Sequence, residues 1–222
     1  MKHTVVAGHY GVGKTNVSVN LALKKAQESD MSVYLIDLDV VNPFFRSSDC
    51  GDLLTEKGIS LISPVFAGSN LDAPSLPPSI QGVFSRNCTV VWDVGGDDSG
   101  SCAIGRYKDK IKADGYEMLY VINMFRPLTE TYGEMKKIMY EIEAASGLRF
   151  TGIINNSNLG GETTAEDIAR SCREACVLSD ETGLKVKFTS VMRNLINKEE
   201  IIKENENLGN IMFLEDITKK YW

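Results

Sequence analysis

Histidine is almost absent from this sequence, which contains only His3 and His9. Catalytic triads of the serine-protease type need a histidine beside the nucleophile, and zinc sites draw most of their ligands from histidine and cysteine. The chain also has no C-x-x-C pair. The sequence therefore argues against a histidine-based triad and against a histidine-rich metal centre.

Long apolar runs are missing as well. No stretch approaches the ~20 apolar residues that a membrane-spanning helix requires. Basic residues are not in surplus, since 24 lysines and arginines face 30 aspartates and glutamates, for a net charge of −6. Proteins that live on nucleic-acid phosphates usually carry a basic excess. We therefore expect neither a membrane nor a nucleic acid to be the main partner.

The cysteines are few and scattered. They are Cys50, Cys88, Cys102, Cys172 and Cys176, an odd number without a disulfide-like spacing. This pattern is typical of the reduced thiols of a cytoplasmic protein, and the N-terminus lacks the pattern of a signal peptide. Cys172 and Cys176 share one face of a predicted helix, and we expect both to face the core.

Strand-like and helix-like segments alternate along the chain. Several strand-like runs are almost continuously apolar, as in parallel strands that helices cover on both faces. The expected strands are Thr4–Ala7, Val33–Asp37, Ile59–Ser63, Thr89–Asp93, Met118–Asn123, Thr151–Asn155 and Val186–Val191. This order predicts an α/β fold of three layers, with a doubly wound, mostly parallel sheet. Without linkers or repeats, residues 1–222 should form a single domain.

Amphipathic patterns locate the main helices. The expected helices are Asn16–Glu28, Glu130–Ala145 and Thr163–Val177. Thr163 should cap the last of these, with Glu166 completing a capping box. The proline-containing segment Ala67–Ser85 should be a surface loop with one helical turn. Leu214–Trp222 should form an amphipathic terminal helix that docks on the domain itself.

A phosphate-binding loop stands near the N-terminus. Residues 8–15 read Gly-His-Tyr-Gly-Val-Gly-Lys-Thr and match G-x-x-x-x-G-K-[ST], between a strand and a helix. Glycines let backbone N–H groups wrap phosphate oxygens, and the helix N-terminus adds a favourable dipole. Lys14 should reach the β- and γ-phosphates, and the Thr15 hydroxyl should bind Mg²⁺. The expected nucleotide contacts here are Gly8, Tyr10, Gly11, Val12, Gly13, Lys14, Thr15 and Asn16.

Two further strands end in carboxylates. Asp37 and Asp39 are two residues apart, so in a strand they would point the same way and repel unless a cation lay between them. Asp93 ends a strand that continues into Gly95 and Gly96, which is the Walker B pattern. Asp93 should hold Mg²⁺ through water, and Gly96 should approach the γ-phosphate and move after it leaves. Asp39 and Asp93 therefore join Thr15 as expected magnesium-site residues.

These elements together resemble the MinD/ParA family of P-loop ATPases, within the CobQ/CobB/MinD/ParA group that includes the nitrogenase iron protein. Residues 8–15, 33–39 and 90–96 carry the resemblance. It implies a nitrogenase-iron-protein-like fold with about seven parallel strands, ATP hydrolysis and ATP-driven dimerisation. It also implies that Asp39 positions the attacking water, so that Lys14 and Asp39 are the two expected catalytic residues. His9 replaces the signature lysine of the family, and Asn16 replaces a frequent second threonine.

The lack of a guanine-recognition motif favours adenine as the bound base. GTP-specific P-loop proteins usually carry N-K-x-D, which this chain lacks. An asparagine amide can pair with adenine. By position, and by resemblance to adenine contacts in the family, Asn155 or Asn156 should read the base; a turn-capping role is the alternative.

Three residues near the expected site have open roles. Arg46 and Arg126 follow strand ends, where an arginine could clamp the γ-phosphate or simply be a surface residue. Cys102 follows Gly96 by six residues, a region where related proteins place cluster-ligating cysteines. One cysteine per subunit is too few for a bridging four-thiolate cluster, even if Cys50 contributed.

The sequence therefore predicts an Mg-ATP-binding protein. We expect a slow ATPase that acts as a nucleotide-dependent switch for an unidentified protein partner, with a nucleotide-dependent homodimer as a further option. The alternative is an ATP-dependent small-molecule enzyme of the dethiobiotin-synthetase type, which has the same fold. That enzyme needs a lysine just after the second strand, where this chain has Val40-Val41-Asn42-Pro43.

Overall fold

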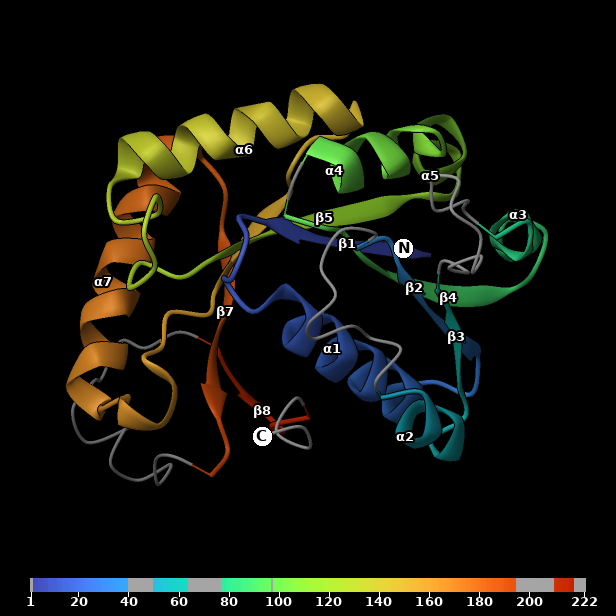
Figure 1. Ribbon diagram of the computed structural model, residues 1–222, viewed down its shortest axis with the longest axis horizontal. Helices are drawn as coiled ribbons and strands as arrows, with labels where there is room; N and C mark the ends of the chain where they lie inside the picture. The colour runs from blue at the N-terminus through green and yellow to red at the C-terminus, as the bar shows by residue number, and fades with distance from the viewer. Residues whose placement is uncertain (1, 40–49, 64–76, 97, 195–209, 218–222) are drawn as a thin grey trace, which may run out of the picture.

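A parallel sheet of eight strands forms the centre of the molecule (Figure 1). The computed structural model describes residues 2–39, 50–63, 77–96, 98–194 and 210–217. The strand order is β3-β2-β4-β1-β5-β6-β7-β8, and every pairing is parallel. The strands are β1 (His3–Gly8), β2 (Ser32–Asp37), β3 (Ile59–Ile62), β4 (Cys88–Asp93), β5 (Tyr116–Ile122), β6 (Gly152–Asn155), β7 (Val186–Met192) and β8 (Ile211–Leu214). Because the chain winds outward from β1 in both directions, the predicted doubly wound α/β fold is confirmed.

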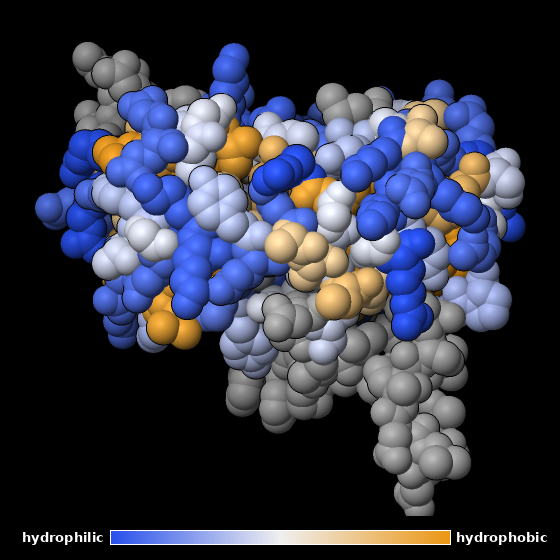
Figure 2. All heavy atoms as spheres, turned by 90° about the horizontal axis from the view of Figure 1, so that it is seen from above, coloured by the Kyte–Doolittle hydropathy of each residue, from blue (hydrophilic) through white to orange (hydrophobic). Residues whose placement is uncertain are grey.

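Helices cover both faces of this sheet. They are α1 (Lys14–Glu28), α2 (Gly51–Glu56), α3 (Ser79–Val83), α4 (Asp98–Gly105), α5 (Lys108–Asp114), α6 (Tyr132–Ser146) and α7 (Ala165–Thr182), with a 3-10 turn η2 at Gly160–Glu162. α1 and α2 lie on one face and the other helices on the opposite face (Figure 1). The surface above α4 and α6 is mostly hydrophilic, with small apolar groups between (Figure 2). None of these helices is both long and apolar enough to cross a membrane.

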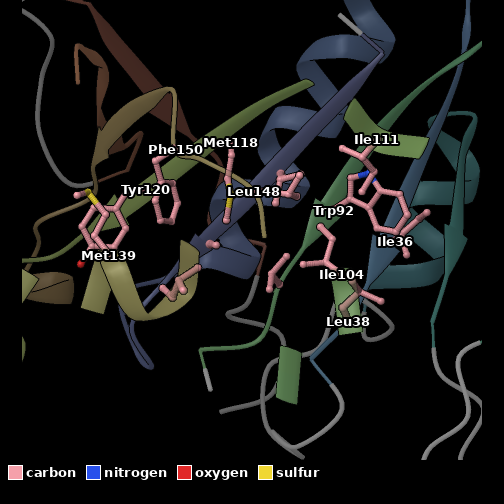
Figure 3. Packing of buried hydrophobic residues seen from close by; sticks show 14 of the residues in the cluster. Ile36, Leu38, Trp92, Ile104, Ile111, Met118, Tyr120, Met139, Leu148 and Phe150 are labelled. Carbon is pink, nitrogen blue, oxygen red and sulfur yellow. The ribbon is translucent and has the colours of Figure 1, made fainter. Parts of the chain in front are cut away.

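The core has two halves, one on each side of the sheet. Successive residues of a strand point to opposite faces, so Val5 packs under α3 to α6 while Val6 packs against α1. Trp92 is completely buried in the first half, together with Ile104 and Ile111 from the covering helices (Figure 3). Burial on both faces is why these strands read as continuous apolar runs in the sequence.

The predicted terminal helix Leu214–Trp222 is not formed in the part of it that the structure describes. Leu214 ends β8, which pairs with β7, and residues 215–217 are not helical, so the prediction was wrong for residues 214–217. The side chain of Asn20 in α1 makes two hydrogen bonds to this segment. Its Nδ2 donates to Glu215 O at 3.0 Å, and its Oδ1 accepts from Glu215 N–H at 2.8 Å. Leu214 and Ile217 pack on the domain itself, as expected. Residues 218–222 lie outside the described part.

The start of α7 differs from the prediction by one residue. Thr164 is the N-cap and Asp167 is its reciprocal partner, in place of Thr163 and Glu166. The Thr163 hydroxyl donates to Gly160 O at 2.7 Å and so closes the preceding 3-10 turn. A local hydrogen bond therefore removes Thr163 from the cap position.

Two other predictions on helices have mixed outcomes. α3 is the helical turn expected within Ala67–Ser85, of which residues 67–76 lie outside the described part.

On α7, Cys172 is buried, and this burial raises the pKa of its thiol. Cys176 is exposed, so the prediction that both cysteines face the core was wrong for Cys176. The buried stripe of α7 runs through Cys172 and Ala175 and leaves Cys176 beside it.

His3 begins the central strand with a completely buried side chain. Its Nδ1 lies 3.2 Å from the Trp92 indole nitrogen, which can only donate. The proton of neutral His3 therefore lies on Nε2, which is 3.3 Å from Asp114 Oδ2. Burial lowers the pKa of His3, although Asp114 opposes this effect.

The free energy of unfolding should decrease as the pH falls below about 6.5, the pKa of an unfolded-chain histidine. The folded-state pKa of His3 is lower than this unfolded-chain value. The contribution of His3 to the free energy of unfolding is therefore fully present above about pH 6.5 and is lost as the pH falls toward the folded-state pKa. Urea unfolding between about pH 8 and pH 5 measures this dependence, which should be weaker in His3→Gln. The same slope in both proteins would contradict the expectation.

Candidate functional site

The phosphate loop joins β1 to α1 at the carboxyl edge of the sheet. Gly11 and Gly13 have φ angles of 76° and 86°, which residues with a side chain rarely adopt. A Cβ on Gly8 would lie 2.4 Å from Val121 O, and one on Gly13 would lie 2.3 Å from Asn156 Nδ2. The backbone therefore needs glycine at these three positions. A loop of this conformation that leads into a helix N-terminus suits a phosphate group.

Lys14 begins α1, and its ammonium group lies against the loop. Its Nζ donates to His9 O at 3.0 Å, and the residue is only 7% exposed. Gly96 lies against the same group, because a Cβ there would be 2.9 Å from Lys14 Nζ and 2.6 Å from Tyr10 N. The glycine that follows the β4 strand thus contacts both the loop and its lysine.

His9 follows the first glycine of the phosphate loop, close to the Lys14 ammonium group. Burial, followed by the nearby Lys14 ammonium, lowers the pKa of His9 below its usual value of about 6.5. The imidazole is therefore neutral at pH 7. A cationic contact from this position is absent at physiological pH.

Gly96→Ala is expected to weaken nucleotide binding by roughly 10-fold. The added methyl would meet the backbone of Tyr10, and overpacking of this kind costs about 1–3 kcal/mol. Gly82→Ala in α3 is a matched control, because a Cβ there has nothing within 4 Å. Calorimetric titration measures both variants. Wild-type affinity in Gly96→Ala would show that the loop does not need this close approach.

Three buried carboxylates gather at the ends of β2 and β4. Asp37 and Asp93 occupy paired positions of the neighbouring strands, and each is at most 2% exposed. Asp37 Oδ1 accepts from the Asp39 N–H at 2.9 Å. β2 ends at Asp37, so Asp39 lies beyond the strand, and the expected placement of both carboxylates within one strand was wrong. Asp93 Oδ1 in turn accepts from Ser18 Oγ at 3.1 Å.

These residues fit a magnesium ion. Buried carboxylates on adjacent strands favour a nearby cation, and Mg²⁺ prefers oxygen ligands, often one or two carboxylates with water and phosphate oxygens. Thr15 and Asp93 are the residues that would hold the ion, with Asp39 beyond the end of the neighbouring strand β2. Across the described ranges, no three His, Cys, Asp or Glu side chains form a direct metal-binding group.

The two asparagines at the end of β6 face in different directions. Asn155 is completely buried, and its amide donates to Ser171 Oγ at 2.9 Å and to Thr189 Oγ1 at 3.3 Å. In this structure its amide nitrogen is therefore used inside the protein. Asn156 donates to Val12 O at 2.7 Å and lies against the phosphate loop.

A small cavity lies at the carboxyl ends of β6 and β7. Asn156, Ser190 and Met192 contribute to its lining, which also includes other small polar residues. Asn16 borders this region from α1, where its Nδ2 lies 3.5 Å from Met192 Sδ. With a volume of about 10 Å³, the cavity has room for about one water molecule. The Asn156 amide is also used inside the protein, since its Oδ1 accepts from Ser190 Oγ.

A larger cleft of about 470 Å³ separates the phosphate loop from α6. It is lined by His9, Gly96, Leu128, Glu134, Lys137, Ile138, Glu141 and Ile142. Leu128 is 59% exposed and has a φ of 65°, which is uncommon for a residue other than glycine. Thr129 fixes this turn, since its hydroxyl donates to Asn123 O at 2.6 Å. Backbone strain of this kind often marks functional surfaces.

The remaining candidates are two arginines and two cysteines. Arg46 lies outside the described residues, and Arg126 is exposed in the loop after β5. Cys50 is buried at the start of α2, whereas Cys102 is exposed on α4. Because α2 and α4 cover opposite faces of the sheet, these two cysteines cannot share a metal ion within one chain (Figure 1).

Comparison with known proteins supports the fold. No protein-family model matches the sequence, and no curated protein matches it significantly. The cell division protein FtsY of Thermotoga maritima is similar in structure, with a TM-score of 0.59 and 22% identity over 90% of this chain and 67% of that one. The 54 kDa signal recognition particle protein of Aeropyrum pernix, solved with GDP, has a TM-score of 0.54 and 15% identity over 84% of this chain and 40% of that one.

Chloroplast FtsY from Physcomitrella patens gives a TM-score of 0.55 and 17% identity, over 90% of this chain and 63% of that one. The chain thus spans between 40% and 67% of the length of these three proteins. At this level of identity the similarity concerns the fold. Together with the loop at residues 8–15, it assigns the chain the fold of the P-loop NTPases.

Proposed function

We propose that this chain binds Mg-ATP, hydrolyses it slowly and acts as a nucleotide-dependent switch for a protein partner. The observation that carries the proposal is the meeting of the phosphate loop, Lys14 and three buried carboxylates at one edge of the sheet. A fold alone does not determine a reaction, whereas this set of residues is suited to phosphate chemistry. Magnesium-dependent release of phosphate from ATP by the purified chain tests it. A protein that binds no nucleotide would refute it.

Each group would have a separate role. Lys14 would neutralise charge on the β- and γ-phosphates, while Thr15 and Asp93 would hold Mg²⁺. The bound ion would stabilise the negative charge of the transferred phosphate. Asp39 would orient the attacking water. Gly96, in contact with Lys14, would report whether the γ-phosphate is present.

The proposed protein partner would bind the carboxyl edge of the sheet. Tyr10, Leu128 and Leu159 are large apolar residues that are 45% to 59% exposed, and they follow β1, β5 and β6. These strands end at the same edge, so the three side chains would respond to the same ligand. A homodimer of the MinD/ParA type would use this edge too. Neutral His9 would not make the cationic contact of the family's lysine.

We expect ATP to bind at least about 10-fold more tightly than GTP, a difference of about 1.4 kcal/mol. The motivation is the missing N-K-x-D motif and the position of Asn156 against the phosphate loop. The similar Aeropyrum pernix protein was solved with GDP, so guanine is the direct competitor. Displacement of a fluorescent ATP analogue by unlabelled ATP and GTP measures the preference. Equal displacement would count against adenine recognition.

A second candidate function is an ATP-dependent small-molecule enzyme. The specific observation in its favour is the cleft beside Gly96, whose volume of about 470 Å³ falls within the range of small-ligand sites. The switch is preferred because Leu128 is exposed at the edge of this cleft and no lysine follows β2 at residues 40–43. ATP turnover that depends on a small molecule but not on any protein would favour the enzyme.

A further inference from the structure

The hydroxyl of Ser18 makes a buried contact across the site. Ser18 lies one helical turn after Thr15 in α1, and its side chain is completely buried. Its Oγ donates to Asp93 Oδ1 at 3.1 Å. This bond joins the helix that follows the phosphate loop to the tip of β4, over a separation of 75 residues.

The stability of α1 does not require a serine at position 18. Serine is a poorer helix former than alanine, and a buried helical serine commonly bonds the carbonyl four residues earlier. The bond of Ser18 instead leaves α1 and reaches the carboxylate on the neighbouring strand. Ser146 is a useful contrast: it is equally buried, and its Oγ donates to Ile142 O of its own helix at 2.7 Å.

We propose that Ser18 is a positioning residue for the magnesium site, which holds the Asp93 carboxylate in the orientation that Mg²⁺ binding requires. A carboxylate on a strand tip can rotate about its Cβ–Cγ bond, and a hydrogen bond to one oxygen fixes the plane of both. The donor also stabilises the ionised carboxylate in a buried setting. Ser18 therefore acts through Asp93 and needs no contact with the nucleotide or the ion. This inference rests on the proposed function.

Outer groups of this kind contribute about 10- to 100-fold to metal affinity. Ser18→Ala should therefore raise the Mg²⁺ concentration at half-saturation by about 10- to 100-fold, measured with a fluorescent, non-hydrolysable ATP analogue. The affinity for the same analogue in EDTA should remain near that of the wild type. Ser18→Cys, with a weak donor of similar size, should give a smaller increase and serves if Ser18→Ala does not fold.

Ser146→Ala is the matched control, because it removes a buried hydroxyl far from the carboxylates. It should lower the free energy of unfolding without changing the Mg²⁺ dependence. Ser18 variants with the Mg²⁺ dependence of the wild type would overturn the inference and leave the proposed function standing. A wild-type protein that binds no nucleotide, with or without Mg²⁺, would overturn both.

Discussion

Lys14→Ala is expected to abolish nucleotide binding in a calorimetric titration, with an affinity at least about 100-fold lower than that of the wild type. Lys14 is 7% exposed and lies at the N-terminus of α1, where its ammonium group donates to His9 O and lies close to Gly96. Polyphosphate carries several negative charges into a partly buried loop. The ammonium group is the cation that the phosphate loop places there, so the loop alone should bind weakly.

Lys24→Ala is the matched control for this variant. Lys24 lies on the same helix, and its side chain is 52% exposed and pairs with Glu28 one turn later. Surface substitutions of this type change stability by about 0.5 kcal/mol or less. Lys24→Ala should bind nucleotide as the wild type does. Unchanged affinity in Lys14→Ala would refute the assignment of the phosphate loop.

The parallel sheet could be predicted from the sequence because its strands are buried on both faces. All seven strands expected from apolar runs are present, and their ends lie within two residues of the expected positions. β4 shows the reason: the whole strand is buried, and Val90, Val91 and Trp92 form an uninterrupted apolar run at its centre. Solvent-exposed strands would alternate and give a weaker signal.

β8 could not be predicted, because it depends on contacts that lie far away in the sequence. Its four residues are too few to distinguish a strand from a helical turn. The segment becomes a strand by pairing with β7 and by its bonds to Asn20, which is 195 residues from Glu215. The Thr163 cap failed for a local reason, since η2 uses that hydroxyl before the helix begins.

The site could be predicted in part. A fixed spacing marks the phosphate loop, and an apolar strand marks Asp93, so short sequence patterns are sufficient for both. The pairing of Asp37 with Asp93 follows from strand order, which no local pattern encodes. Ser18 and Leu128 leave no motif, because serines in helices and leucines in loops are common. The Ser18 contact depends on the packing of α1 against β4, and the exposure of Leu128 depends on the turn before α6, which no local pattern encodes.

Asp39→Ala is expected to retain nucleotide binding while turnover falls by about 10²- to 10⁴-fold, the range for loss of an acid–base group. The attacking water must be oriented in line with the γ-phosphate. Asp93 is held by Ser18 and suits the metal, and Asp37 accepts from the Asp39 backbone. Asp39 is 9% exposed, the most accessible of the three carboxylates, and lies beyond the end of β2. It is therefore the carboxylate best placed to meet a water molecule.

The experiment measures phosphate release and analogue affinity side by side. Asp30→Ala, an exposed aspartate in the turn before β2, should leave both quantities unchanged. Asp39→Ala should also accumulate any ATP-bound dimer, seen as a larger species by light scattering, because the complex would no longer be resolved by hydrolysis. Wild-type turnover in Asp39→Ala would assign the water to another carboxylate, with Asp37 the next to test. Loss of affinity together with turnover would instead make Asp39 part of the magnesium site, because binding and catalysis would then depend on the same interaction.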